Sequence, residues 1–181
     1  MVDAPHILLV DDDTALLQAL PHMVALRIHG VKVDTADSAI EALEMIQLCD
    51  YDAIISDIKM PGMDGLELLA RIREIRPETP TLLITGHMQP ENVTEAMKNG
   101  AYDFIQKPID RVYFVAALHR AIQTRQLRRQ VHEQQQLLLT YSHTLEQLVE
   151  QNPEEAAAVA EVVNVEEKEP VPFQPPHWLV S

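Results

Sequence analysis

Three short apolar runs constrain the fold of this chain more than any other feature. They are ILLV at residues 7–10, AIIS at 53–56 and LLIT at 82–85. None alternates between apolar and polar residues, as a strand with one face in water does, so each predicts a strand buried on both faces. Such strands belong to parallel sheets that carry helices on each side.

Two further strand patterns and five helical patterns complete an alternation along the chain. We expect strands at 6–10, 31–36, 51–56, 81–85 and 101–106, and helices at 14–28, 37–48, 65–74, 90–98 and 111–124. This order predicts an α/β fold, a doubly wound five-stranded parallel sheet with (βα)5 topology. Pro21 falls inside the first helix and is expected to kink or break it, because proline has no backbone N–H.

A long helical pattern follows the alternating region. We expect one domain over residues 1–124 and a helical extension over 125–152. The extension repeats at steps of four and three through Leu127, Val131, Gln134, Leu138, Tyr141, Leu145, Leu148 and Asn152. This heptad-like spacing predicts a coiled coil, the stalk of a parallel homodimer. The alternative is a solvated helix that packs only on its own domain.

The last part of the chain, residues 153–181, has a different composition. It carries six acidic side chains and one basic one, and it holds five of the twelve prolines. We expect this acidic, proline-rich tail to be disordered. Its end, with Phe173, Trp178, Leu179 and Val180 among prolines, is either a short docking peptide or a tail without a function.

Charge and composition exclude several classes of function. The net charge of -14 disfavours nucleic acid and anionic membranes as partners, because both repel an acidic surface. The single cysteine, Cys49, permits no internal disulfide. No apolar run is long enough to span a bilayer, and the N-terminus has no signal-peptide pattern. We therefore expect a cytoplasmic protein.

Polar side chains follow four of the expected strands, and parallel strands bring their carboxyl ends to one edge of a sheet. They are Asp11, Asp12 and Asp13 after the first strand, Asp57 after the third, Thr85 and Gly86 after the fourth, and Lys107 after the fifth. Ligands of open parallel sheets bind at this edge. Carboxylates that converge there repel one another, and Mg²⁺ is the cation whose oxygen preference suits them.

Four motifs occur together over residues 5–124: VDDD at 10–13, SDIKMPGMDG at 56–65, LLITGH at 82–87 and QKP at 106–108. In their order and spacing the chain resembles a two-component response-regulator receiver domain, of the nitrogen-regulation type. The resemblance implies a flavodoxin-like sheet in the order 2-1-3-4-5. It also implies that Asp57 accepts a phosphoryl group from a histidine kinase or a phosphotransfer protein.

The resemblance further implies a role for each matching residue. Asp11, Asp12, Asp57 and the backbone carbonyl of Lys59 would hold Mg²⁺, and Lys107 would assist the transfer. Thr85 would be the switch hydroxyl and Phe104 the switch aromatic. Lys59, Gly86 and His87 would flank the phosphoryl group. Asp13 matches a variable position and is not expected to be a metal ligand.

We therefore expect a phosphorelay response regulator that is not an enzyme acting on a separate substrate. Its phosphorylation would switch contacts with a protein target or dimerisation, since nothing after residue 124 resembles a DNA-binding or ATPase domain. The chain would be either complete or a fragment of a longer regulator. One alternative is a scaffold that works through the long helix and tail without phosphorylation. A dehalogenase-type phosphatase is disfavoured because its signature would need Thr or Val where Ala15 stands.

Overall fold

The computed structural model describes residues 4–86 and 90–151, in which strands and helices alternate. The elements are β1 (His6–Val10), α1 (Thr14–Ala25), β2 (Lys32–Ala36), α2 (Ala39–Leu48), β3 (Ala53–Asp57), α3 (Gly65–Ile75), β4 (Thr81–Thr85), α4 (Pro90–Lys98), β5 (Asp103–Gln106) and α5 (Arg111–Gln151). The predicted alternation is confirmed. The ends differ most at α1, which stops before residue 28, and at α5, which continues beyond residue 124.

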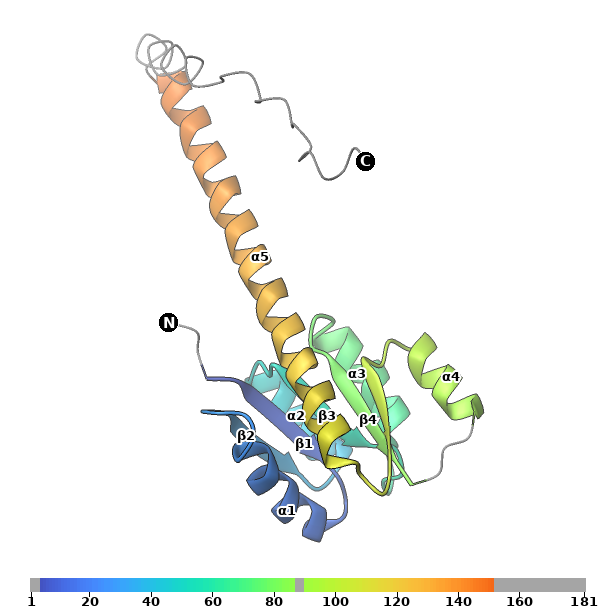
Figure 1. Cartoon of the computed structure of the whole chain (residues 1–181). Coiled ribbons are helices and arrows are strands. Elements are labelled where there is room, and N and C mark those ends of the chain that lie inside the picture. The colour runs from blue at the N-terminus through green and yellow to red at the C-terminus, as the bar shows by residue number, and fades with distance from the viewer. Residues whose placement is uncertain (1–3, 87–89, 152–181) are drawn as a thin grey trace, which may run out of the picture. The chain divides into compact units, whose positions relative to one another are not determined.

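The strands form one parallel sheet in the order β2-β1-β3-β4-β5, as the resemblance implied (Figure 1). The last residue of β1, Val10, lies opposite Ala36 of β2 and Ser56 of β3. On the other side Thr85 of β4 lies opposite Gln106 of β5. Because these pairs are in register, the carboxyl ends of all five strands meet at one edge.

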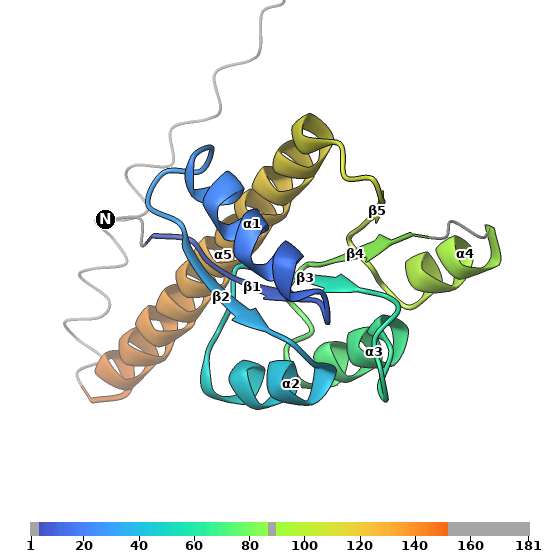
Figure 2. The same cartoon turned by 90° about the horizontal axis from the view of Figure 1, so that it is seen from below.

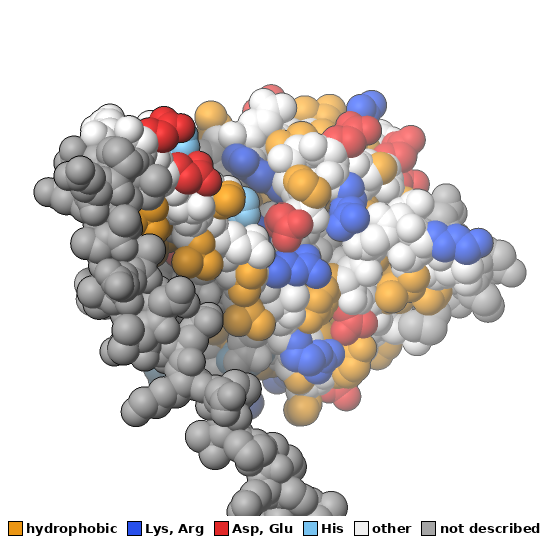
Figure 3. Space-filling view, turned by 90° about the horizontal axis from the view of Figure 1, so that it is seen from above, with side chains coloured by type: hydrophobic (Ala, Val, Ile, Leu, Met, Phe, Trp, Pro, Cys, Tyr) orange, Lys and Arg blue, Asp and Glu red, His pale blue; other side chains and the backbone are white. Residues whose placement is uncertain are grey.

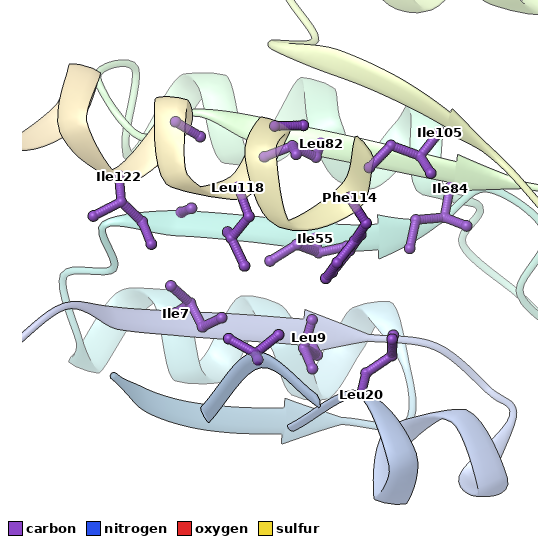
Figure 4. Close-up of a cluster of buried hydrophobic side chains, with 14 of the residues drawn as sticks. Ile7, Leu9, Leu20, Ile55, Leu82, Ile84, Ile105, Phe114, Leu118 and Ile122 are labelled. Atoms are coloured by element: carbon purple, nitrogen blue, oxygen red, sulfur yellow. The ribbon is translucent and has the colours of Figure 1, made fainter. Parts of the chain in front are cut away.

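Helices cover both faces of the sheet. Figure 2 shows α1 and the first part of α5 on one face, and α2 and α3 on the other. Successive strand residues point to opposite faces, so Ile7 and Leu9 pack in the first layer, and Leu8 and Val10 pack in the second. Figure 4 shows the first layer, where Phe114 and Leu118 of α5 face the apolar side chains of the strands. The unbroken apolar runs are thus explained by burial on both sides.

Pro21 lies inside α1, where we expected a kink or a break. The break is not found, because the helix continues through Pro21 to Ala25. Proline removes one hydrogen bond from a helix interior. On either side of it, Leu20 and Val24 are buried against the sheet. Packing of these two side chains holds the backbone in place where local preference alone would not.

Arginines of α5 form ion pairs with acids on the loops between elements. Arg125 and Arg129 each lie 3.0 Å from a carboxylate oxygen of Asp50, and Arg129 is 3.4 Å from Asp52. Figure 3 shows Lys and Arg side chains next to Asp and Glu side chains on the face it views. These contacts reach beyond residue 124, where we predicted the domain to end, and the compact unit that contains the sheet extends to Val131.

Residues from His132 onward belong to a separate unit. Within it, α5 exposes large apolar side chains at the spacing noted in the sequence. Leu138, Tyr141 and Leu145 are 67%, 60% and 57% exposed. The predicted tail at 153–181, and Asn152 at the end of the heptad pattern, lie outside the described residues. No helix in the described part of the chain is long and apolar enough to cross a membrane.

Candidate functional site

The candidate site lies at the carboxyl edge of the sheet, where β1, β3 and β5 end. Asp11 directly follows β1, Asp57 is the last residue of β3, and Lys107 directly follows β5. The backbone N–H of Lys107 donates to the carbonyl of Thr85 at 2.7 Å, which fixes the start of the β5–α5 connection against the end of β4. The site residues predicted from separate strands are therefore brought together.

Lys107 links the two buried carboxylates of the site. Its Nζ atom lies 3.0 Å from Asp11 Oδ2 and 3.0 Å from Asp57 Oδ1. The side chains of Asp11 and Asp57 are only 5% and 7% exposed, whereas that of Lys107 is 30% exposed. The other oxygen of Asp57 accepts the backbone N–H of Lys59 at 3.0 Å. Both oxygens of Asp57 are thus held by donors.

Three carboxylates share the site. One oxygen each of Asp11, Asp12 and Asp57 lies within 4.8 Å of the others, with Asp12 exposed and the other two buried. Oxygen donors so grouped fit a Mg²⁺ ion that keeps several waters, because the exposed side of the cluster leaves room for them. Asp13 instead caps α1, since its side chain accepts the N–H groups of Ala15 and Leu16. Asp13 therefore caps the start of α1.

Burial raises the pKa of the Asp57 carboxyl, and the Lys107 ammonium, which lowers that pKa, does not cancel the effect. The negative charge of Asp11 also raises it. Burial by itself would lower the pKa of Lys107, but its hydrogen bonds to Asp11 and Asp57 outweigh burial and raise it. Lys107 is therefore a positive charge at neutral pH. One ammonium faces three carboxylates, so the site favours a further cation.

The remaining predicted residues surround this centre. Thr85, at the end of β4, is buried with 1% exposure. Phe104 of β5 lies opposite Leu83 and packs, partly buried, against the cluster that includes Ala96 of α4. At Gly86, an added Cβ would have no described heavy atom within 4 Å, so the approach there is open. His87 lies outside the described residues.

Gly65, the last residue of the SDIKMPGMDG motif and the first residue of α3, is a further feature of the site. An added Cβ at this position would overlap the carbonyl oxygen of Asp57 and lie 2.8 Å from the Cα of Ile58. The N–H of Gly65 donates to the carbonyl of Ile58 at 2.8 Å. The start of α3 is therefore pressed against the backbone of Asp57, a contact that no local sequence pattern reveals.

Gly65→Ala is expected to destabilise the fold by about 1–3 kcal/mol, because backbone atoms must move to admit the methyl group. Gly86→Ala is the matched control, since its methyl group enters open space and should change stability by less than about 1 kcal/mol. Urea unfolding followed by circular dichroism measures both. Equal midpoints for the two variants would contradict the close approach of Gly65 to Asp57.

The fold and site define a class of protein: a doubly wound α/β domain whose sheet edge presents a buried aspartate, two further acids and a lysine. The response regulator receiver domain model matches residues 7–119. The chain belongs to this family. Receiver domains accept phosphoryl groups, generally bind Mg²⁺ at an acidic site, and interact with histidine kinases or phosphotransfer proteins.

Individual relatives agree with this assignment. The C4-dicarboxylate transport transcriptional regulatory protein DctD of Pseudomonas aeruginosa is 41% identical over 123 residues, covering 67% of this chain and 26% of DctD. The nitrogen assimilation regulatory protein NtrX of Azorhizobium caulinodans is 39% identical over 144 residues, 78% of this chain and 31% of NtrX. The chain thus matches only about a quarter to a third of the length of these relatives.

A solved structure shows the same fold. The signal receiver domain of an HD domain-containing protein from Pseudomonas fluorescens Pf-5 superposes with a TM-score of 0.64 at 32% identity. The match covers 67% of this chain and 97% of that one. The family match at residues 7–119 contains the whole sheet, helices α1 to α4 and the first turns of α5.

Proposed function

We propose that this chain is a phosphorelay response regulator in which Asp57 accepts a phosphoryl group from the phosphohistidine of a kinase or phosphotransfer protein. The observation that carries this proposal is the environment of Asp57. Its carboxylate is buried at the edge of the sheet, lies 3.0 Å from the Lys107 amine, and belongs to a cluster of three acids. A structural aspartate at a strand end has no need of such a cluster.

In the proposed reaction a carboxylate oxygen of Asp57 attacks the phosphorus atom. An O–P bond forms to give an acyl phosphate, the P–N bond to the donor histidine breaks, and the released imidazole takes up a proton. A Cβ at Gly86 would meet no described atom, and this open space is the proposed approach for the phosphohistidine. Lys107, already 3.0 Å from Asp57 Oδ1, is placed to neutralise charge on the transferred group.

Mg²⁺ would be held by Asp11, Asp12, Asp57 and the backbone carbonyl of Lys59. When bound, it supplies positive charge to the phosphoryl oxygens during transfer. Asp11 is already oriented, because it accepts the Lys107 amine and the backbone N–H of Asp13 at 2.8 Å. Asp12, the exposed member of the cluster, accepts no hydrogen bond within the described part of the chain and can adjust to the ion.

Thr85 and Phe104 are the proposed switch. The Thr85 hydroxyl would bond a phosphoryl oxygen, and Phe104 would then turn inward behind it. Phe104 packs against the same cluster as Ala96 of α4, so its movement would change how α4 packs on the sheet. Phosphorylation thereby favours one of two arrangements of α4, β5 and α5. Lys59 and His87 are proposed to flank the phosphoryl group.

The output proposed here is a change of protein contacts, either with a target protein or with a second copy of the chain. DctD and NtrX are named as regulatory proteins, but the match to each covers a minor part of its length. The scaffold alternative, in which phosphorylation has no role, is favoured by one observation. Large apolar side chains of α5, such as Leu138 and Leu145, are exposed in the unmodified chain, so a surface for another protein is present without phosphorylation.

Acetyl phosphate with Mg²⁺ is expected to add one phosphoryl group to the chain, detected by intact mass. Asp57→Asn should give no adduct, because the nucleophile is removed. Asp110→Asn, in the exposed cap of α5, is the matched control and should behave as the wild type. Light-scattering mass, measured alongside with beryllofluoride, tests dimerisation. An unmodified wild type with no response to beryllofluoride would favour the scaffold.

A further inference from the structure

The apolar contacts between α5 and the sheet end at Ile122. Phe114, Leu118 and Ile122 are at most 3% exposed, and Figure 4 shows their side chains directed toward the strands. From residue 123 to the end of the compact unit that contains the sheet, no residue of α5 is buried, and Leu127, for example, is 62% exposed. Residues 123–131 are therefore held to the domain by contacts other than apolar packing.

Ion pairs hold this part of α5. Three of its arginines pair with acids of the loops before β3 and β4. The pairs are Arg125 with Asp50 at 3.0 Å, Arg128 with Glu78 at 3.8 Å, and Arg129 with Asp50 at 3.0 Å and with Asp52 at 3.4 Å. One neutral hydrogen bond, between the hydroxyl groups of Tyr102 and Thr124 at 3.0 Å, accompanies them. Polar contacts at the amino edge of the sheet thus fix the end of this unit.

These ion pairs are of a kind that opens readily. The Asp50 side chain, which pairs with two arginines, is 42% exposed, and that of Arg129 is 35% exposed. Ion pairs that water and salt ions can reach are weak and are screened by salt. In addition, Arg125 Nε and Asp52 Oδ1 are buried without a hydrogen-bond partner among the described residues, which is unfavourable to the closed arrangement.

The position of the ion pairs along α5 gives them a consequence for the extension. Their acids lie within the part of the chain that the receiver family model matches, and their arginines follow its end at residue 119. The heptad-like pattern begins at Leu127, between the paired arginines. Whether residues 123–131 stay with the domain or move with the extension therefore decides how much of this pattern is free to contact another helix.

We propose that a releasable ionic clasp holds residues 123–131 of α5 to the amino edge of the sheet. The clasp consists of Asp50, Asp52, Glu78, Arg125, Arg128 and Arg129. When it opens, α5 stays attached to the domain only as far as Ile122, and the core keeps its structure. The proposal does not depend on phosphorylation of Asp57.

Hydrogen exchange of backbone amides, followed by mass spectrometry of the whole chain, measures opening of the clasp. A helix that loses its contacts with the rest of a protein is much less stable in water, so its amides exchange faster. We expect exchange over residues 123–131 to become several-fold faster when NaCl is raised from a low concentration to about 0.5 M. Exchange over residues 114–122, which pack on the core, should not change.

The double variant Arg125→Gln with Arg129→Gln removes the ion pairs with Asp50 and Asp52. Glutamine and arginine have similar helix propensities, so the local preference for a helix is kept. We expect exchange over residues 123–131 of this variant to be several-fold faster than in the wild type at low salt, with little further response to salt. Replacement of both arginines by lysine keeps the charges and should retain part of the protection.

Arg71→Gln is the matched control for the loss of an arginine. Arg71 forms an exposed ion pair with Glu74 at 3.4 Å on α3, away from the clasp. This variant should exchange over residues 123–131 as the wild type does, at every salt concentration. Circular dichroism verifies that each variant is folded.

Three results would overturn the proposal. The first is a folded glutamine variant whose residues 123–131 exchange as slowly as in the wild type, because other contacts then hold the segment. The second is exchange over residues 114–122 that quickens together with exchange over 123–131, because the end of α5 would then open only with the core. The third is an equal response to salt in the wild type and the glutamine variant, which would show that salt acts elsewhere.

Discussion

Lys107→Met will destabilise the folded chain by roughly 3 kcal/mol at neutral pH, the lower end of the range for breaking a buried ion pair. The Lys107 amine lies 3.0 Å from both Asp11 and Asp57, whose side chains are almost fully buried. Without it, neither carboxylate has an ion pair with any other residue that the structure describes. The expected destabilisation is at the lower end of the range for buried ion pairs because the Lys107 amine is itself partly exposed.

The loss of stability in Lys107→Met will depend on pH. Burial already raises the pKa of Asp57, and removal of the Lys107 ammonium raises it further. A carboxyl whose pKa is higher in the folded state than in the unfolded state contributes stability below the unfolded value, near pH 4, and that contribution disappears as the pH rises through the folded pKa. The variant should therefore approach wild-type stability under acidic conditions and fall away from it toward neutral pH.

Urea unfolding of the wild type and of Lys107→Met, from acidic to neutral pH, measures the difference between their free energies of unfolding. Mg²⁺ should restore part of the loss at neutral pH, because the ion replaces the missing positive charge. Lys59→Met is the matched control, since it removes an exposed amine beside the site and keeps the backbone N–H that Asp57 accepts. A constant difference between wild type and Lys107→Met at all pH values would contradict the electrostatic origin.

The fold could be predicted because its central strands appear in the sequence as short, unbroken apolar runs. Runs such as Ile7–Val10 have no polar alternation, and the structure buries them between two layers of helices. The proximity of Asp57 and Lys107 could also be predicted, because the carboxyl ends of parallel strands meet at one edge of the sheet. Their exact pairing at 3.0 Å could not be predicted, since it depends on side-chain conformations across 50 residues of sequence.

Features that depend on contacts between distant elements were not predictable from the sequence. Pro21 disfavours a helix locally, but burial of Leu20 and Val24 keeps α1 continuous. The pairing of Arg129 with Asp50 joins residues from opposite parts of the chain, and no periodicity marks it. An apolar groove between α1 and α5 likewise exists only after the two helices pack side by side on the sheet.

Asp12→Asn and Asp13→Asn form a pair of variants that separates metal binding from helix capping. Asp12 belongs to the acid cluster, whereas the Asp13 side chain accepts two N–H groups at the start of α1. Asparagine caps helices about as well as aspartate, so Asp13→Asn should retain both stability and Mg²⁺ binding. Asp12→Asn removes one charged oxygen ligand, and we expect Mg²⁺ affinity to fall at least tenfold, about 1.4 kcal/mol.

Two measurements separate the variants. At a Mg²⁺ concentration one hundred times its dissociation constant, the ion stabilises the wild type by about 2.7 kcal/mol, and the same concentration should stabilise Asp12→Asn by about half as much. The yield of acetyl phosphate adduct should fall in parallel, because charge on the phosphoryl oxygens is then less well neutralised. If Asp13→Asn lost Mg²⁺ stabilisation as strongly as Asp12→Asn, the ion would be bound through the loop after β1 as a whole. The proposed assignment of Asp11, Asp12 and Asp57 as its carboxylate ligands would then be wrong.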